Sequence, residues 1–358
     1  MERKGCLVLE DGHVFEGRMI GADLDSIGEL VFTTGVVGYL ETLTDPSYEG
    51  QIILQTFPLI GNYGVIPEDF ESGKVWARGY VTREICDLPS NFRAKGRLDD
   101  FLKQQNVAAL CGIDTREVTR IIRERGVMNA AIVREMTDDL FGELRSWRLK
   151  DALRTVSQGK TTEYPAEGTE ICRIALIDYG AKRNIERELN RRGAHVTVFP
   201  YDVKAETILE GGFDGLMLSN GPGDPAENQE CIAQLKALLG KMPIFGICLG
   251  HQMLALAAGA RTTKLKYGHR GANQPVKRVS DSSMFITSQN HGYAVVSDSL
   301  PEFARESYVN ANDQTNEGVE YPSLRAFSTQ FHPEACGGPK DTDFLFDQYI
   351  AEVTKACR

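Results

Sequence analysis

Residues 244–256 read Ile-Phe-Gly-Ile-Cys-Leu-Gly-His-Gln-Met-Leu-Ala-Leu and decide the fold of the second half of the chain. A short apolar run precedes Cys248, and a helix-forming stretch follows it. Gly246 and Gly250 stand two positions before and after the cysteine, where a sharply bent backbone needs neighbours without a Cβ atom. The pattern predicts a strand, a tight turn with Cys248 at its tip, and a helix, which is the arrangement of a nucleophile elbow.

The position of Cys248 also predicts its chemistry. A thiol at the tip of such a turn lies at a helix N-terminus, where unpaired N–H groups and the helix dipole favour the nucleophilic thiolate. A buried structural cysteine is the alternative, because most single cysteines are of that kind. The two flanking glycines favour the nucleophile.

A base and an orienting acid follow late in the chain. His332 lies in Phe-Ser-Thr-Gln-Phe-His-Pro-Glu-Ala at 327–335, where a strand-like run ends at a proline. Glu334 is placed to hold one ring nitrogen of His332 while the other nitrogen faces the sulfur, in the order nucleophile, base, acid. His251 is the competing base, but one turn into the predicted helix its side chain is expected to point away from the elbow tip and to be structural.

The second half alternates between apolar strands and amphipathic helices. Strands are predicted at 174–178, 196–199, 215–219 and 244–247, and helices at 182–192, 205–210 and 228–239. This alternation predicts an α/β fold with a doubly wound, mostly parallel sheet covered on both faces. Ligands bind such sheets beyond the carboxyl ends of the strands, where Asn220–Pro225 and Cys248 both fall.

The first half reads as a β-rich α+β domain. Short strand-like runs at 6–9, 30–33, 52–56 and 78–82 are separated by Gly, Pro and Asp turns, and a helix is predicted at 115–124 with Asp114 as N-cap and Gly126 after its end. The segment 157–170 is polar and aperiodic. We therefore predict an N-terminal domain at 1–155, a linker at 156–170 and a second domain at 171–358.

Composition excludes several classes of protein. The net charge of −10 argues against a general nucleic-acid binder, and no apolar run reaches the length of a membrane span or a signal peptide. The eight cysteines contain no Cys-x-x-Cys pair, so no zinc or thioredoxin signature is present and no metal site is predicted. We expect reduced thiols in a cytoplasmic protein.

Four motifs follow one another in the second half: Asn-Gly-Pro-Gly-Asp-Pro at 220–225, Gly-Ile-Cys-Leu-Gly-His-Gln at 246–252, Gln-Asn-His-Gly-Tyr at 289–293 and Phe-His-Pro-Glu-Ala at 331–335. Together they resemble the class I, triad-type glutamine amidotransferases over roughly residues 171–355. Further motifs at 9–12, 38–48, 90–93, 112–116 and 178–185 extend the resemblance, over the whole chain, to the family of small, glutamine-hydrolysing subunits of carbamoyl-phosphate synthase.

The resemblance implies a Cys248–His332–Glu334 triad that hydrolyses glutamine through a glutamyl thioester. The oxyanion would be held by two backbone N–H donors, one from Leu249 by the rule for elbows and the other from Gly223 in the Gly-Pro-Gly loop. A phosphate-binding function of this loop is the less favoured interpretation, because Pro222 lacks an N–H group and no Gly-Lys-Ser/Thr sequence follows.

The resemblance also implies which residues bind glutamine: Ser47, Gly221, Gly223, Leu249, Gln252, Asn290, Gly292 and Tyr293. Gln252 is one helical turn from Cys248 and can face the same cavity. Asn290 and Gly292 are expected in a turn-like segment, for which an ordinary Asx-turn is the alternative. The assignment of Ser47 to the glutamine site rests on the family pattern alone. Tyr293 occupies a position where phenylalanine is common in the family that the chain resembles.

A large partner subunit is implied as well. It would bind ATP, Mg²⁺ and bicarbonate, receive ammonia through an internal channel, and make carbamoyl phosphate for arginine or pyrimidine biosynthesis; no cofactor is expected on this chain. Two alternatives remain. One is another amidotransferase or hydrolase, serving anthranilate, GMP or CTP synthesis or cleaving γ-glutamyl bonds. The other is a non-catalytic scaffold that keeps the fold.

Overall fold

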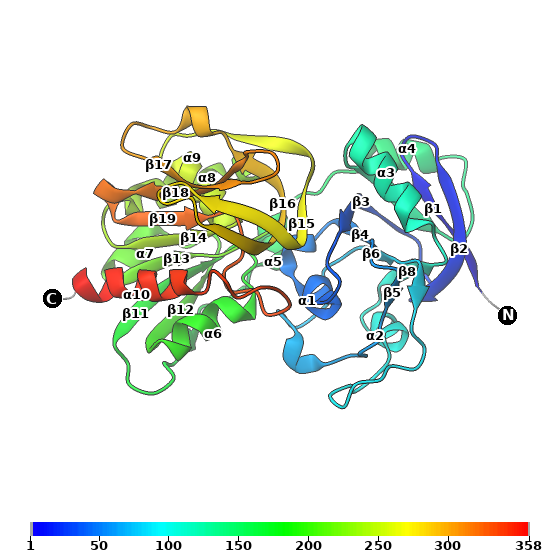
Figure 1. The fold of residues 1–358 in the computed structure, drawn as a ribbon, viewed down its shortest axis with the longest axis horizontal. Coiled ribbons are helices and arrows are strands. Elements are labelled where there is room, and N and C mark those ends of the chain that lie inside the picture. The colour runs from blue at the N-terminus through cyan, green and yellow to red at the C-terminus, as the bar shows by residue number, and fades with distance from the viewer. Residues whose placement is uncertain (1–2, 357–358) are drawn as a thin grey trace. The chain divides into compact units, whose positions relative to one another are not determined.

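The computed structural model describes residues 3–356, and the chain divides into two compact units, Met1–Ala152 and Leu153–Arg358 (Figure 1). Each unit has its own sheet and its own hydrophobic core. Within residues 3–356, no helix has both the length and the apolar character needed to cross a membrane.

Unit 1 is built around a closed β-barrel. Its strands, in the order of their pairing, are β1 (Lys4–Leu9), β2 (Val14–Gly21), β8 (Ala108–Cys111), β6 (Gly79–Val81), β4 (Gln51–Gln55), β3 (Ser26–Thr33) and β9 (Met128–Val133). The barrel closes because β9 pairs with both β1 and β3, which leaves no free strand edge. The other elements are α1 (Tyr39–Thr44), η1 (Pro46–Tyr48), β5 (Leu59–Ile60), η2 (Pro67–Asp69), β7 (Glu84–Ile85), α2 (Leu98–Gln104), α3 (Thr115–Arg125) and α4 (Leu140–Ser146).

The β-rich character predicted for this unit is confirmed, and so is its best-defined helix. Helix α3 begins where expected, because the side chain of Asp114 accepts a hydrogen bond of 3.1 Å from the N–H of Glu117. The helix ends at Gly126, which has a φ of 101°. Glycine adopts this value without strain, whereas other residues do not. The barrel itself was not predicted, because its closure depends on pairings between strands far apart in the sequence.

Unit 2 is an α/β sheet with further antiparallel strands. It starts within α5 (Ala152–Val156) and continues through β10 (Thr162–Tyr164), β11 (Cys172–Asp178), α6 (Arg183–Arg191), β12 (Ala194–Pro200), α7 (Ala205–Glu210), β13 (Gly215–Leu218), η3 (Pro225–Glu227), α8 (Gln229–Leu238), β14 (Ile244–Ile247) and α9 (Leu249–Ala257). The rest comprises β15 (Thr262–Arg278), β16 (Met284–Val295), η4 (Ser297–Ser299), β17 (Arg305–Asn310), β18 (Asn316–Tyr321), η5 (Pro322–Leu324), β19 (Ala326–Thr329) and α10 (Phe344–Ala356).

The strands of unit 2 form one sheet in the order β10-β12-β11-β13-β14-β19-β18-β17-β15-β16. The section from β12 to β19 is parallel, as predicted, whereas the section from β19 to β16 is antiparallel. Strands β14 and β19 are parallel neighbours, so their carboxyl ends meet at the same edge of the sheet. This adjacency brings the elbow at 248 next to the His-Pro-Glu segment at 332–334.

Two apolar cores cover the two faces of this sheet. In β11, Ile174 and Leu176 pack with residues of α6 and α10, whereas Ala175 and Ile177 pack with residues of α7, α8 and α9. Successive residues of a strand point to opposite faces, so an apolar strand without polar alternation is buried on both sides. The doubly wound α/β fold predicted from the apolar runs is confirmed.

The segment 156–170 differs from the predicted linker. Thr162–Tyr164 forms β10, which pairs antiparallel with β12 at the edge of the sheet, and the N–H of Gln158 donates to Asp178 at 2.6 Å. The segment therefore belongs to unit 2. A three-residue edge strand is too short to give a periodic pattern, which is why the sequence suggested a linker.

Candidate active site

Cys248 lies at the tip of the predicted elbow, between β14 and α9. Its φ and ψ are 54° and −103°, a conformation that costs a non-glycine residue roughly 1–3 kcal/mol. Both glycines are sterically required: a Cβ atom on Gly246 would lie 2.7 Å from the carbonyl oxygen of Gly250, and one on Gly250 would lie 2.4 Å from that of Leu218. The backbone is thus forced into a shape that presents the thiol beyond the end of the strand.

We expect Gly250→Ala to destabilise unit 2 by roughly 1–3 kcal/mol, because the new methyl group meets backbone that cannot rotate away. The matched control is Gly142→Ala in α4, where a Cβ atom meets nothing within 4 Å. That helix-interior change should leave stability unchanged or raise it by about 0.5–1 kcal/mol. Denaturant unfolding of both variants measures the difference, and equal midpoints would contradict the steric account of the elbow.

His332 and Glu334 lie together in the segment after β19. The Nδ1 atom of His332 is 2.7 Å from Glu334 Oε1, and both side chains are buried. The pair also meets a residue from the other end of unit 2, because Lys182 Nζ is 3.1 Å from His332 Nδ1 and 3.3 Å from Glu334 Oε1. A carboxylate that faces Nδ1 leaves Nε2 as the working nitrogen of the ring.

The charges in this cluster set its protonation. Burial and the Lys182 ammonium both oppose a second proton on His332, but the Glu334 carboxylate and Cys248 outweigh them and raise its pKa to about 9. Burial alone would raise the pKa of Glu334, but His332 and Lys182 lower it to about 2. At neutral pH the cluster therefore holds an imidazolium ion beside a carboxylate and an ammonium.

The thiol lies near this imidazolium. Cys248 is close enough to raise the pKa of His332, and its Sγ atom is 3.6 Å from the carbonyl oxygen of Asn290. Within residues 3–356, His332 Nε2 is buried without a hydrogen bond of ordinary length. A nitrogen in this state, beside a thiol, can exchange a proton with the sulfur or with a group bound to it.

The loop after β13 is held close to the elbow. Asn220 is fully buried, and its side-chain oxygen accepts a 3.1 Å hydrogen bond from the N–H of Lys182. Gly221 fits because it lacks a Cβ atom, which would lie 2.1 Å from the carbonyl oxygen of Tyr179. Gly223 has a φ of 90°, in the region that favours glycine, and Leu249 is the first residue of α9, where N–H groups point out of the helix end.

Among the residues predicted to bind glutamine, Gln252 and Tyr293 are in direct contact. The side-chain amide of Gln252 donates to the carbonyl oxygen of Tyr293 at 2.8 Å and to Gln330 Oε1 at 2.9 Å. The expectation of a turn around Asn290 and Gly292 was wrong. Both residues lie in β16, paired with β15, although the register of this pair shifts on either side of the segment.

Ser47 lies in unit 1, in η1, where its N–H donates to Asp45 Oδ1 at 2.9 Å. Its place in the glutamine site stays a prediction. His251, the competing base, is fully buried, with its Nδ1 atom 2.8 Å from Ser328 Oγ, and burial lowers its pKa to about 3. It is held as a neutral ring, in agreement with the structural role predicted for it.

Sequence reasoning missed Lys182 and Asn184. Lys182 contacts both His332 and Glu334, and the side-chain amide of Asn184 donates to the backbone oxygen of Glu334. Both residues follow the carboxyl end of β11, in the Asp-Tyr-Gly-Ala-Lys-Arg-Asn motif at 178–184. A charged residue within one turn of chain after a buried parallel strand was the available signal.

Comparison with known proteins matches both halves of the chain. The family model "Carbamoyl-phosphate synthase small chain, CPSase domain" matches residues 7–132, and "Glutamine amidotransferase class-I" matches residues 175–351. The carbamoyl phosphate synthase small chain of Clostridium perfringens is 48% identical over 97% of this chain and 99% of its own length, and that of Listeria monocytogenes serotype 4b is 48% identical over 97% and 96%. A solved structure of a glutamine amidotransferase from Thermotoga maritima aligns over 52% of this chain and 85% of its own, with 23% identity and a TM-score of 0.40. On the strength of its full-length relatives, the chain belongs to the family of carbamoyl-phosphate synthase small chains.

Proposed function

We propose that this chain is the glutamine-hydrolysing subunit of a carbamoyl-phosphate synthase, and that Cys248, His332 and Glu334 carry out the hydrolysis. The observation that supports this most strongly is the position of His332. One nitrogen of its ring contacts Glu334 at 2.7 Å, the other forms no ordinary hydrogen bond within residues 3–356, and the ring lies beside Cys248. Full-length relatives named as small chains of this enzyme support the choice of substrate and product.

The reaction begins with a thiolate and an imidazolium. The sulfur of Cys248 attacks the side-chain amide carbon of glutamine, the C=O π bond breaks, and the carbonyl oxygen becomes an oxyanion. The oxyanion would be stabilised by the N–H groups of Leu249 and Gly223, and removing one such donor typically costs roughly 3–4 kcal/mol of transition-state stabilisation. His332 donates its proton to the departing nitrogen, the C–N bond breaks, and ammonia and a glutamyl thioester remain.

Hydrolysis of the thioester uses the same groups in reverse. His332, now neutral, takes a proton from a water molecule, which attacks the thioester carbon. The C–S bond breaks, glutamate leaves, and the thiolate and imidazolium are restored. Glu334 and Lys182 keep the charge balance around the ring throughout, because the carboxylate stabilises the imidazolium and the ammonium keeps that carboxylate ionised.

The proposal includes a division of labour between two chains. Ammonia released here would pass to a large subunit that binds ATP, Mg²⁺ and bicarbonate and makes carbamoyl phosphate, in a heterodimer or a larger assembly of it. Its product would serve arginine or pyrimidine biosynthesis in the cytoplasm. The family to which the chain belongs supports the existence of a large subunit. The Gly-Pro-Gly loop is not followed by the Gly-Lys-Ser/Thr of a phosphate-binding loop, which agrees with ATP binding on the other chain.

A glutamine-analogue electrophile separates this enzyme from a non-catalytic scaffold. We expect stoichiometric labelling of Cys248 in the wild type and loss of labelling in Cys248→Ser, read by peptide mass spectrometry. Cys231 is the internal control, because burial raises the pKa of its thiol to about 11 and keeps it protonated. Labelling of Cys231 at the same rate, or persistent labelling of the Cys248→Ser variant, would favour the scaffold.

A further inference from the structure

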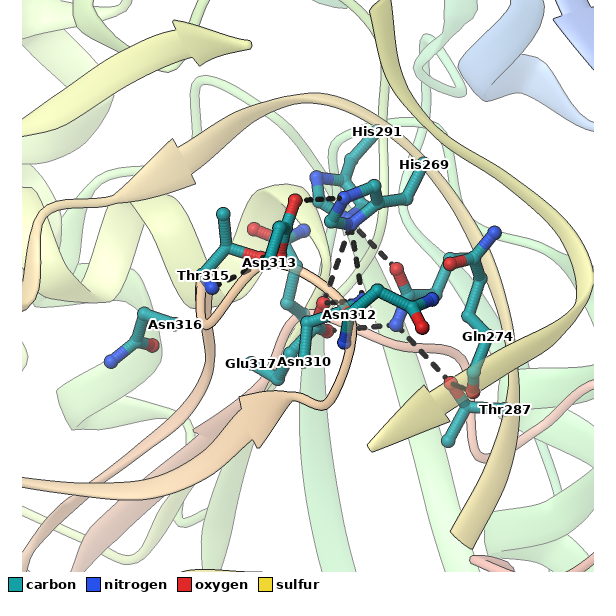
Figure 2. Close-up of polar contacts among 12 residues, drawn as sticks. His269, Gln274, Thr287, His291, Asn310, Asn312, Asp313, Thr315, Asn316 and Glu317 are labelled. Atoms are coloured by element: carbon teal, nitrogen blue, oxygen red, sulfur yellow. Dashed lines mark hydrogen bonds and ion pairs between the residues drawn. The ribbon is translucent and has the colours of Figure 1, made fainter. Parts of the chain in front are cut away.

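A second buried cluster lies in the antiparallel part of unit 2, on residues that the proposed chemistry does not use. His269 in β15, His291 in β16 and Glu317 in β18 form this histidine–glutamate cluster (Figure 2). Each offers one metal-ligating atom, and these atoms all lie within 4.8 Å of one another. His269 is paired with His291 across the two strands, and their rings meet edge to face at 4.9 Å.

Each imidazole is held from outside the cluster by an oxygen atom. His269 Nε2 is 2.9 Å from Asp313 Oδ2, and His291 Nδ1 is 2.8 Å from the carbonyl oxygen of Tyr293. Carboxylate and carbonyl oxygens only accept, so these two nitrogens carry the ring protons. His269 Nδ1 and His291 Nε2 remain to face the cluster, which is the pattern of metal-binding histidines oriented by an outer hydrogen bond.

Burial lowers the pKa of His269, but hydrogen bonds to Asp313 and Glu317 outweigh it and raise the pKa to about 9, so a bound ion would displace a proton from Nδ1. The neighbouring side chain of Asn310 also faces this nitrogen. The backbone N–H of Asn312 donates to Asn310 Oδ1 at 2.9 Å, which fixes the orientation of that side-chain amide. The Nδ2 group of Asn310 therefore points into the cluster, 3.1 Å from Glu317 Oε1 and 3.4 Å from His269 Nδ1. This donor faces the acceptor Glu317 Oε1 and lies beside His269 Nδ1.

The side chain of Gln289 creates a conflict that a cation would resolve. Thr287 Oγ1 donates to the carbonyl oxygen of Gln274 and therefore accepts from Gln289 Nε2, which also donates to Glu317 Oε2 (Figure 2). This fixes Gln289 Oε1 toward His291 Nε2, at 3.1 Å. With the ring proton on Nδ1, two lone pairs face each other there, and a positive charge is needed between them.

We propose that His269 Nδ1, His291 Nε2 and Glu317 Oε1 bind a divalent transition-metal ion of the zinc type, with Gln289 Oε1 as a fourth ligand. Imidazole nitrogens and a carboxylate suit such an ion. Two ligand atoms about 2.1 Å from one ion, at a tetrahedral angle, lie about 3.4 Å apart. His269 Nδ1 and Glu317 Oε1 are 3.4 Å apart.

The ion would tie three strands together beside the candidate active site. It would join β15 and β18 through one residue of each strand, and β16 through His291 and Gln289. His291 lies between Asn290 and Gly292, and the carbonyl oxygen of Asn290 is 3.6 Å from Cys248 Sγ. The absence of a metal predicted from cysteine spacing is therefore revised in this proposal, because these ligands are scattered over three strands and leave no motif in the sequence.

Metal binding is measured on the full-length chain carrying Cys248→Ser, which removes the candidate nucleophile as a competing ligand. After treatment with a chelator, zinc is titrated by calorimetry, and cobalt is added in parallel because its absorption separates nitrogen and oxygen ligands from thiolates. We expect about one ion per chain, bound without a thiolate band, and a rise in melting temperature with zinc.

Variants of this parent locate the site. Glu317→Gln and His269→Gln should lose the ion, and Asp313→Asn, which reaches the ion only through His269, should weaken binding roughly 10–100-fold. The matched control is His195→Gln, because His195 lies 3.3 Å from Glu170 and 3.9 Å from Glu163 at a partly exposed position that resembles a metal site only in composition. It should bind zinc like the parent.

Three results would overturn the proposal. The first is the absence of zinc binding by the parent, and the second is an equal loss of binding in His195→Gln and Glu317→Gln. The third is a nuclear magnetic resonance spectrum that shows both nitrogens of His291 protonated in the presence of zinc, because a proton would then occupy the place assigned to the ion. If Glu317→Gln fails to fold, Asp313→Asn decides the matter through its affinity and its zinc-dependent melting temperature.

Discussion

Replacing Cys248 by serine, or His332 by alanine, is expected to abolish carbamoyl-phosphate synthesis from glutamine and to leave synthesis from free ammonia intact in the complex with the large subunit. Loss of the nucleophile or of its proton-exchange partner removes the route to the thioester, whereas added ammonia bypasses this chain. Comparable losses in triad hydrolases reduce the rate on the order of 10⁴–10⁶-fold. Both activities are measured on the same preparation, as product formed with saturating glutamine or with ammonium.

The control for this experiment is Cys231→Ser. Cys231 is also buried in unit 2, and its Sγ atom donates to the carbonyl oxygen of Tyr201 at 3.4 Å, a bond that a serine hydroxyl can keep. This variant should retain both activities. An equal loss of the glutamine and ammonia reactions in Cys248→Ser would mean that the residue supports the fold or the complex and not the hydrolysis of glutamine.

Glu334→Gln is expected to lower the rate of glutamine hydrolysis by roughly 10²–10⁴-fold and to change its pH dependence. The carboxylate is the main group that raises the pKa of His332 to about 9, against burial and Lys182. Below that pH the ring carries the proton that it must give to the departing nitrogen, and as the pH rises through about 9 that proton is lost. In the variant, only Cys248 still opposes burial and Lys182, so the imidazolium is lost at a lower pH.

The pH profile of kcat/KM measures this change, because it reports the protonation of the free enzyme. In the wild type we expect kcat/KM to fall as the pH rises through about 9, with an apparent pKa that belongs to the coupled cluster as a whole. In Glu334→Gln this fall should occur at a lower pH. Glu117→Gln, at an exposed position in α3 of unit 1, should leave the profile unchanged. An alkaline limb at the same pH in the wild type and in Glu334→Gln would contradict the role given to the carboxylate.

The elbow could be predicted from the sequence because its determinants are local. An apolar strand, a bend between two glycines and a helix stand within a few residues of Cys248, and the close contacts of Gly246 and Gly250 explain why no other residue fits there. The parallel strands were predictable for the same reason, since each is a continuous apolar run buried on both faces.

Other features depend on contacts between distant segments. Strand β16 is irregular, because its pairing with β15 shifts register on both sides of the segment that contains Asn290, so the residues there looked like a turn. The contact of Lys182 with His332 joins residues 150 positions apart and follows only from the order of the strands. The closed barrel of unit 1 likewise needs β9 to lie between β1 and β3.

The role of Cys248 as the nucleophile is tested most directly by stopping the reaction with acid during turnover of glutamine and identifying the modified peptide by mass spectrometry. A sulfur poised beside a protonated imidazole should carry a glutamyl group, attached through a bond that hydroxylamine cleaves. The peptide containing Cys248 is the predicted site, and Cys248→Ser should show no adduct. Continued hydrolysis of glutamine with no adduct at Cys248, or with the adduct on another residue, would contradict the central claim.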